Sequence, residues 1–259
     1  MVRFGTPLVS PAVTTRIGVD VGGSGVKAGV VDVGAGELVS ERLRVDTPEP
    51  STPPAVAAAV KELVDQLEAP GRVGLGFPSV MRQGWATTAN NIDESWVGVN
   101  ARELFETTLG REVVLINDAD AAGLAEVRYG AAKGVSGKVL VLTFGTGIGS
   151  ALIVDGKLLP NIELGQLELG GVRPAEKRYS AKSRRAENLS WDEWGARARE
   201  FIVLANEVFT PDLIVIGGGV SKFWDEFASH VTFDDVKTTK AALANNAGIV
   251  GAAALAFSD

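Results

Sequence analysis

Two aspartates lie at the ends of apolar runs, where their carboxylates could do chemistry. Asp20 comes just before a glycine turn, and Asp118 follows Asn117 at the end of another apolar run. Moving a phosphoryl group to an alcohol requires a carboxylate that accepts the proton and a group that organises a metal ion on the phosphates. Each aspartate could equally be a turn residue or a helix N-cap, so neither position decides the chemistry alone.

Three glycine runs give these aspartates a context. A glycine turn between strands leaves backbone N–H groups unshielded, so that an anion can approach them closely. Hydroxyl and ammonium groups in the same turns add further donors. The predicted phosphate-binding residues are Asp20, Gly22, Gly23, Ser24 and Lys27 in the first run, Thr143, Gly145, Thr146 and Gly147 in the second, and Gly217, Gly218 and Gly219 in the third. Any single run could also be a plain tight turn.

The first two glycine runs lie in segments that resemble each other. The segment VDVGGSGVKAGVVD at residues 19–32 can be laid over LTFGTGIGSALIVD at residues 142–155 without a gap, which aligns Gly22 with Gly145 and Asp32 with Asp155. Each segment reads as a strand, a glycine turn and a returning strand. A duplicated hairpin of this kind predicts two related domains that face each other across a cleft.

Two other phosphate-binding motifs can be set aside. Gly23, Gly25 and Ala28 fit the dinucleotide fingerprint G-x-G-x-x-A, but that fingerprint requires the glycines to open a helix. Residues 26–33 keep the character of a strand, which disfavours an oxidoreductase. The P-loop motif G-x-x-x-x-G-K-[ST] does not occur in the sequence.

The remaining pattern is that of an α/β protein. Consecutive antiparallel strands are expected at residues 16–21, 26–33 and 38–45, and further strands at 73–77, 113–116, 139–144, 150–154 and 213–216. Helices are expected at residues 53–67, 119–128, 189–208 with Ser190 as N-cap, and 247–257. Residues 1–15 contain two prolines and a glycine, and they are predicted to be a flexible tail.

Composition restricts the class of protein. The formal net charge of −7 argues against a broad nucleic-acid-binding surface. No apolar run is long enough to span a bilayer, and the absence of cysteine excludes disulfides and thiolate metal sites. We therefore expect a cytoplasmic protein that acts neither on membranes nor on nucleic acids.

Six segments of the sequence occur in the order found in one known family. They are DVGGSGVK at residues 20–27, INDADAAG at 116–123, LTFGTGIGS at 142–150, PNIELGQLE at 160–168, IGGGVS at 216–221 and NAGIVGAA at 246–253. From about residue 16 to its end, the chain resembles the ROK group of sugar kinases and regulators. Within that group it is most similar to the branch of polyphosphate glucokinases, which includes enzymes that also use ATP or phosphorylate mannose.

This resemblance implies an actin-like (ribonuclease H-like) ATPase fold with two duplicated domains around a cleft. The small domain would comprise residues 16–116, with the helix of residues 247–259 packing back on it, and the large domain residues 117–246. The implied activity is transfer of a phosphoryl group from inorganic polyphosphate, ATP or both to the 6-hydroxyl of glucose or mannose. A homodimer is also implied. Because the segment ahead of residue 16 is short, a ROK repressor with its DNA-binding domain is not expected.

The resemblance also assigns roles to residues. Asp118 would be the general base, and Asp20 would help to place Mg²⁺ on the donor phosphates. The implied sugar-binding residues are Asn91, Asn117, Asp118, Glu163, Gln166 and Glu176, with Glu168 as a weaker candidate. Other ROK kinases carry a cysteine zinc motif that this branch lacks, so no zinc is expected.

One position departs from the family pattern. Gln166 stands where the family has a histidine that binds a sugar hydroxyl, and the only histidine here, His230, lies outside the motifs and is predicted to be on the surface. Glutamine can donate and accept a hydrogen bond, but it is uncharged and differently shaped. A kinase for another sugar or polyol therefore stays open. A non-catalytic sugar or polyphosphate sensor is a third reading, although a sensor would not need Asp118.

A basic strip follows the predicted sugar-binding segment directly. It consists of Arg173, Lys177, Arg178, Lys182, Arg184 and Arg185, with Glu176 and Glu187 as the only acids among them. It could be an ordinary solvated face. A long polyanion such as polyphosphate would benefit from such a strip, whereas ATP needs none.

Overall fold

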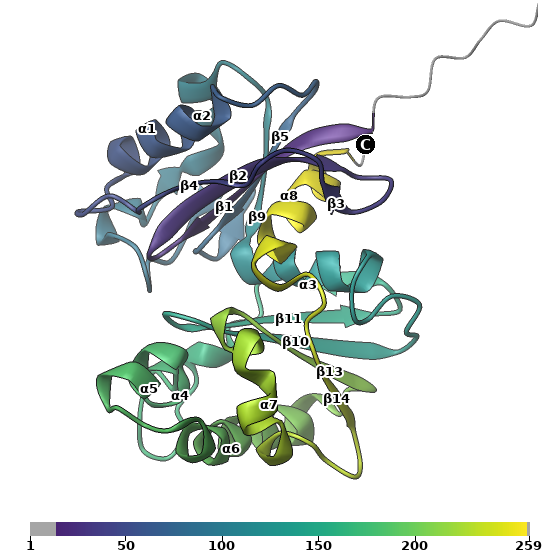
Figure 1. Cartoon of the computed structure of the whole chain (residues 1–259). Coiled ribbons are helices and arrows are strands. Elements are labelled where there is room, and N and C mark those ends of the chain that lie inside the picture. Colours follow the sequence, from purple (N-terminus) through teal and green to yellow (C-terminus); the bar gives the residue numbers. More distant parts are fainter. Residues whose placement is uncertain (1–13, 258–259) are drawn as a thin grey trace, which may run out of the picture.

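Two mixed β-sheets lie one above the other in the computed structural model, which describes residues 14–257 (Figure 1). The first sheet has the order β3-β2-β1-β5-β9, with β4 also paired to β2. Its strands are β1 (Thr15–Gly22), β2 (Gly25–Asp32), β3 (Glu37–Leu38), β4 (Leu43–Val45), β5 (Val73–Phe77) and β9 (Val113–Asn117). The second sheet has the order β12-β11-β10-β13-β14. Its strands are β10 (Lys138–Phe144), β11 (Ile148–Val154), β12 (Lys157–Leu159), β13 (Leu213–Gly217) and β14 (Lys237–Lys240).

The two sheets have the same topology. In each, the first two strands form an antiparallel hairpin, a third strand extends it on one side, and two parallel strands extend it on the other. The glycine turns join β1 to β2 and β10 to β11. The predicted duplication of the hairpin is therefore confirmed.

The predicted third strand, residues 38–45, is wrong as a continuous element. The structure has two short strands there, of which β3 pairs with the end of β2 and β4 with its beginning. The chain leaves the ladder at Ser40, whose hydroxyl oxygen accepts the hydrogen bond of the Val30 N–H at 2.9 Å. That side chain replaces the backbone carbonyl that a regular strand would offer.

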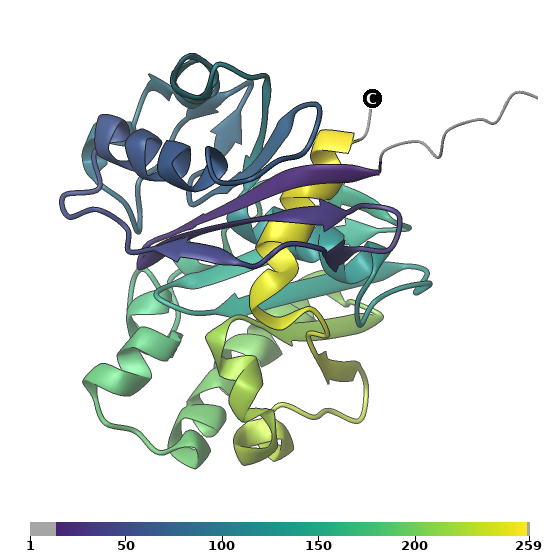
Figure 2. The ribbon, with the colours of Figure 1, turned by 45° about the horizontal axis from the view of Figure 1, so that its top comes forward.

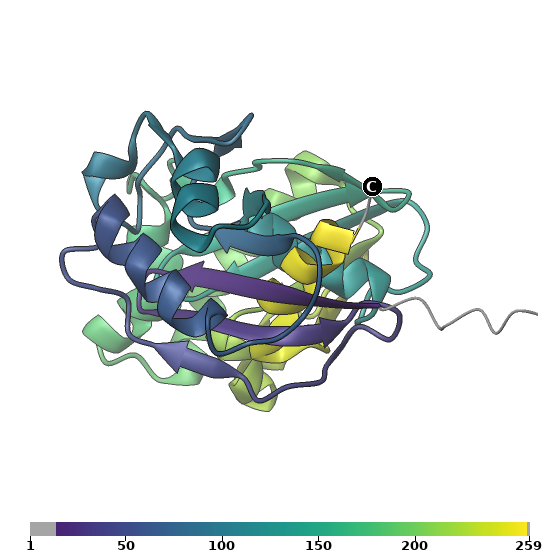
Figure 3. The same ribbon diagram turned by 90° about the horizontal axis from the view of Figure 1, so that it is seen from above.

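Helices cover the outer face of each sheet. On the first sheet these are α1 (Pro53–Val64) and α2 (Ala101–Leu109); seen from above in Figure 3, α1 lies beside the β1–β2 hairpin. On the second sheet α6 (Trp191–Phe209) lies with the short helices α4 (Glu176–Tyr179), α5 (Ala181–Ala186) and α7 (Trp224–Phe227). The predicted N-cap of α6 is confirmed, because Ser190 and Glu193 form a capping box. The predicted first helix ends earlier than expected, since the N–H groups of residues 66 and 67 bond three residues back and form tighter turns beyond Val64.

Two helices are exchanged between the sheets. Helix α3 (Asp118–Arg128) follows the first sheet but packs on β10 and β11 of the second, and α8 (Ala247–Phe257) follows the second sheet but packs on β1 and β5 of the first (Figure 2). Helix α8 lies close to the first sheet. A Cβ atom on Gly18 or Gly74 would stand 2.0 Å or 1.8 Å from a carbonyl oxygen of α8, so both positions require glycine. The exchange ties the two halves together at the place where the cleft lies.

A small antiparallel sheet that the sequence did not predict lies between β5 and α2. It consists of β6 (Met81–Arg82), β7 (Trp85–Ala86) and β8 (Val99–Asn100), with the 3-10 turn η1 (Glu94–Trp96) in between. Trp96 is fully buried, and its ring packs on Phe77 and Phe105. This packing anchors a long loop that carries Asn91. Of the predicted flexible tail, residues 1–13 lie outside the described part, and Thr15 already belongs to β1.

Candidate active site

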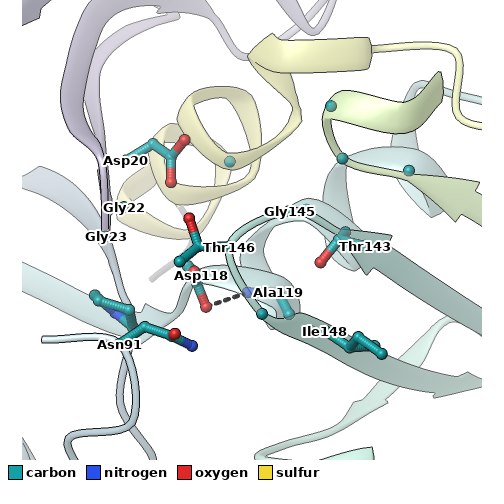
Figure 4. A pocket seen from close by; sticks show the side chains of 18 of the residues that line it. Asp20, Gly22, Gly23, Asn91, Asp118, Ala119, Thr143, Gly145, Thr146 and Ile148 are labelled. Carbon is teal, nitrogen blue, oxygen red and sulfur yellow. Dashed lines mark hydrogen bonds between the residues drawn. The ribbon is translucent and has the colours of Figure 1, made fainter. Parts of the chain in front are cut away.

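Both hairpin turns and the junction between β9 and α3 border one cleft of about 390 Å³. In Figure 4 the side chains of Asp20, Asn91, Asp118 and Thr146 project into it. The main residues predicted to bind the sugar and the donor phosphates line this cleft: Asp20, Gly22, Gly23, Ser24, Lys27, Asn91, Asn117, Asp118, Thr143, Gly145, Thr146, Gly147, Glu163, Gln166, Glu176, Gly217, Gly218 and Gly219. The weaker candidate Glu168 is exposed and is not among the lining residues.

Asp118 is held at the first position of α3. The helix begins there because the side-chain oxygen of Asn117 accepts hydrogen bonds from the N–H groups of Ala119 and Asp120, at 2.9 Å and 3.1 Å. The amide nitrogen of Asn117 donates in the opposite direction, to the Ser79 carbonyl at 3.2 Å. Asn117 therefore has a fixed orientation, and the backbone that carries Asp118 is fixed with it.

The carboxylate of Asp118 is poised near neutral pH. Burial, followed by the negative charge of Asp20, raises its pKa from 3.8 to about 7. A hydrogen bond of 2.8 Å from the Ala119 N–H to Oδ1 acts in the opposite direction. A carboxylate with a pKa near the working pH is suited to act as a general base.

Further acids surround Asp118 at one end of the cleft. Burial raises the pKa of Glu163 to about 7, and the charges of Asp120 and Glu176 add to the effect. Glu176 is buried, and its Oε2 accepts the hydrogen bond of the Ile148 N–H at 3.1 Å. Gln166 lies half-buried in the 3-10 turn η2 (Leu164–Gln166). Carboxylates and amides that converge in this way can form hydrogen bonds with the hydroxyl groups of a polyol.

The tips of the two hairpins meet around Asn91. A Cβ atom on Gly23 would stand 2.8 Å from the Asn91 carbonyl oxygen, and one on Gly147 would stand 2.6 Å from the Asn91 side-chain nitrogen. Lys27 pairs with Asp20 at 2.8 Å beside the first tip. The backbones of both tips therefore border the same part of the cleft, and the ammonium group of Lys27 lies at its edge.

The third glycine run closes the opposite end of the cleft. Gly218 has a φ of 79°, and a Cβ atom there would stand 2.5 Å from the Phe144 carbonyl oxygen, so this position requires glycine. Ala241, Ala244 and Asn245, from the loop before α8, line the same end.

Sequence reasoning missed Glu126, which shapes this end of the cleft. It is buried in α3, and its carboxylate accepts hydrogen bonds from the N–H groups of Ala131, Ala242 and Leu243 at 2.8 Å, 3.0 Å and 2.9 Å. Ser79, which follows β5, and Thr88 and Asn90, which follow β7, also line the cleft and were missed. In the sequence these are ordinary polar residues, and no pattern distinguishes them from other loop residues.

The basic strip is divided in the structure. Arg185 lines the cleft, and the backbone N–H of Lys182 donates to the Gly145 carbonyl at 3.0 Å. Arg173 and Lys177 are exposed away from it. The guanidinium groups of Arg178 and Arg184 instead lie over the rings of Tyr179 and Trp191, at 5.7 Å and 3.7 Å from the ring centres. Only part of the strip therefore faces the cleft.

The described residues restrict how a metal ion could bind. In residues 14–257 no group of three or more His, Cys, Asp or Glu side chains is arranged to hold a metal. Asp20 offers one carboxylate to the cleft, and Lys27 already takes one of its oxygens. This donor set fits a Mg²⁺ ion that draws most of its ligands from bound phosphates and water. His230, predicted on the surface, is half-buried and lies 2.7 Å from Asp192.

Between residues 14 and 257, none of the helices has the length and apolarity needed to cross a membrane.

The chain is similar in sequence to proteins of one family. The family model described as "ROK family" matches residues 16–163. The sequence is 42% identical to the polyphosphate glucokinase of Mycobacterium tuberculosis over 254 residues, which is 96% of this chain and 95% of that protein. The polyphosphate glucokinase of Mycobacterium leprae is also 42% identical, over 98% of this chain and 81% of that protein.

Two crystal structures extend the comparison to the fold. The inorganic polyphosphate/ATP-glucomannokinase from Arthrobacter sp. strain KM superposes with a TM-score of 0.89 at 46% identity, covering 93% of this chain and 97% of that chain. A ROK family glucokinase from Streptomyces griseus, in complex with glucose and AMPPNP, superposes with a TM-score of 0.79 at 26% identity, over 93% and 99% of the two chains.

Proposed function

Because this chain belongs to the ROK family, we propose that it is a sugar kinase that transfers a phosphoryl group from inorganic polyphosphate, ATP or both to the 6-hydroxyl of glucose. Its actin-like ATPase fold is that of ROK sugar kinases. The observation that carries the proposal is the position of Asp118. Its carboxylate, with a pKa of about 7, lines the same cleft as both glycine turns.

In the proposed reaction Asp118 accepts the proton of the sugar hydroxyl. The hydroxyl oxygen attacks the terminal phosphorus of the donor, a P–O bond forms to the sugar, and the bridging P–O bond breaks. The donor leaves one phosphate shorter and keeps the electron pair of the broken bond. The side-chain nitrogen of Asn117 donates to Oε1 of Glu163 at 3.4 Å. These two polar side chains would orient the sugar beside Asp118 through hydrogen bonds to its hydroxyl groups.

We propose that the turns at residues 22–24 and 145–147 hold the donor phosphates, with Lys27 and the run at residues 217–219 adding contacts. Asp20 would help to place a Mg²⁺ ion on the donor phosphates, and this ion would neutralise negative charge on the transferred phosphoryl group. The absence of zinc stays a prediction. Substitution of Asp118 by Asn should lower turnover by at least about a hundredfold while glucose binding stays measurable. A variant that turns over near the parent rate would show that another residue is the base.

Gln166 bears on the identity of the sugar. Mannose is the second acceptor that we propose, in line with the glucomannokinase relative. A coupled assay with several sugars and polyols, run with ATP and with polyphosphate, tests the acceptor and the donor together. Activity on another sugar but not on glucose would favour a rebuilt pocket, and restoring histidine at Gln166 would then recover no glucose activity. Binding without turnover in any combination would favour a sensor.

The part of the basic strip near the cleft supports a role in polyphosphate binding. Arg185 lies in the cleft wall, and Lys182 lies next to the second glycine turn. Activity with polyphosphate should therefore fall more steeply with salt than activity with ATP. Equal salt slopes for the two donors would remove the strip from the proposal.

Three further features are proposed on the same basis. The two sheets would belong to two domains that meet at residues 116–117, with α8 returning to the first. The protein would be cytoplasmic and would form a homodimer, as the resemblance to ROK kinases implies. Size-exclusion chromatography with light scattering tests the dimer.

A further inference from the structure

The carbonyl groups of the first glycine turn are held by side chains from outside the cleft. The hydroxyl of Thr47 donates to the Gly22 carbonyl at 2.5 Å, and the guanidinium of Arg44 donates to the Ser24 carbonyl at 3.0 Å. Both side chains come from β4 and the residues just after it. Because β4 pairs with β2, with Arg44 opposite Lys27, the chain that leaves β4 runs alongside the turn.

Holding a carbonyl fixes the N–H of the next residue, because the two groups point in opposite directions across a planar trans peptide. The bond from Thr47 therefore fixes the direction of the Gly23 N–H. Within residues 14–257 the N–H groups of Gly23 and Ser24 donate to no protein acceptor, and both residues line the cleft. Thr47 does not line the cleft, so it acts on the turn from behind.

The second hairpin has a longer tip, but the residue that aligns with Gly22 in sequence has a comparable contact. Gly145 aligns with Gly22 in the duplicated segments, and its carbonyl accepts a hydrogen bond from the Lys182 backbone N–H at 3.0 Å. At both tips, the carbonyl at the start of the turn is bound by a neighbouring segment. In the second tip the donor is a backbone N–H, whereas in the first it is a side-chain hydroxyl, which a conservative substitution removes.

We propose that Thr47 is a positioning residue for the phosphoryl donor, with Arg44 in a supporting role. Thr47 aligns the Gly23 N–H for a donor phosphate, and Arg44 steadies the Ser24–Gly25 peptide and adds positive charge behind the turn. Arg44 has the smaller effect, because its side chain is 49% exposed and also pairs with Asp46. The inference rests on the proposed function, since it assumes that the turn binds donor phosphates.

The test is Thr47→Val, which keeps the shape of the side chain and removes its hydroxyl. The binding of tripolyphosphate and of a non-hydrolysable ATP analogue is measured by calorimetry, and KM is measured for donor and for glucose. We expect both donor ligands to bind about five- to tenfold more weakly, with the KM for glucose changed less than twofold. Thr47→Ser, which keeps the hydroxyl, should bind within about twofold of the parent.

Thr108→Val is the matched control. Thr108 is also half-buried, and its hydroxyl donates to the Leu104 carbonyl at 2.8 Å within α2, away from the cleft. It should leave both KM values unchanged. Unchanged donor binding in Thr47→Val, or equal weakening for donor and glucose, would overturn the inference, as would a parent that binds neither donor ligand. A parent that binds tripolyphosphate but phosphorylates no sugar would refute the proposed function alone, because calorimetry needs no turnover.

Discussion

Replacing Asp118 by Asn should stabilise the protein, and more so at high pH than at low pH. The fold raises the pKa of this carboxyl from 3.8 to about 7, chiefly by burial and then through the charge of Asp20. A raised pKa means that the folded state favours the protonated form. The stability contributed by this group is therefore full below about pH 4 and is lost as the pH rises to about 7. Asparagine resembles the neutral form at every pH.

The size of the effect follows from the shift in pKa. The shift from 3.8 to about 7 amounts to roughly 4 kcal/mol of free energy of unfolding lost by the parent above pH 7. At pH 5 the parent has lost only part of this free energy of unfolding, because the Asp118 carboxyl is still protonated in the folded state. Water in the open cleft screens some of the penalty. The stability gap between Asp118→Asn and the parent should therefore widen by about 2 kcal/mol between pH 5 and pH 8.5.

Urea unfolding followed by tryptophan fluorescence measures this gap at each pH, and the five tryptophans of the chain give the signal. Asp93→Asn is a control of opposite sign. Hydrogen bonds from the Ser95 hydroxyl and N–H lower the pKa of Asp93, so its stabilising effect is present at high pH and lost as the pH falls. This variant should lose stability, most clearly at high pH. A gap for Asp118→Asn that stays constant with pH would refute the assignment of a raised pKa.

Three further outcomes are expected. Turnover of the parent should fall about tenfold per unit below pH 7 as Asp118 becomes protonated, and a flat profile from pH 5 to 8 in a stopped assay would contradict this. Gly74→Ala should lower the free energy of unfolding by about 3 kcal/mol or more, because its Cβ would meet the Ala252 carbonyl oxygen, whereas the exposed Gly34→Ala should change it little. Glu126→Ala should lower it by about 2–4 kcal/mol in urea, since three backbone N–H groups lose their acceptor; a loss below 1 kcal/mol would argue against that role.

The parts of the site that could be predicted from the sequence are those encoded locally. Each glycine turn lies between two alternating apolar runs, so the hairpins and their exposed tips are written in consecutive residues. The same is true of Asp118, where a short apolar run, an asparagine and an alanine-rich segment specify a strand, a cap and a helix. The two hairpins and the Ser190 cap were confirmed for the same reason.

The parts that could not be predicted depend on contacts between distant residues. Glu126 binds N–H groups that lie 116 and 117 residues further along the chain, and no local pattern marks its carboxylate as buried. The hydroxyl of Thr47 reaches a carbonyl 25 residues earlier. The break in the predicted strand at residues 38–45 depends on one side chain, Ser40, replacing a backbone acceptor. Asn91 was found only through the family resemblance, because its loop carries no periodic signal.

The exchange of α3 and α8 explains how two like charges come to share one cleft. Asp118 begins α3, and Asp20 packs against the start of α8, where a Cβ atom on Gly248 would stand 2.7 Å from the Asp20 carboxyl carbon. The repulsion between the two carboxylates, which contributes to the raised pKa of Asp118, is offset by apolar packing between the helices and the sheets, including Ala122, Ala125, Val250 and Ala253. Lys27 pairs with one oxygen of Asp20, and the charge of Asp20 still contributes to the raised pKa of Asp118. The packing of the exchanged helices thus holds the base in a state that favours accepting a proton, at the point where both glycine turns converge.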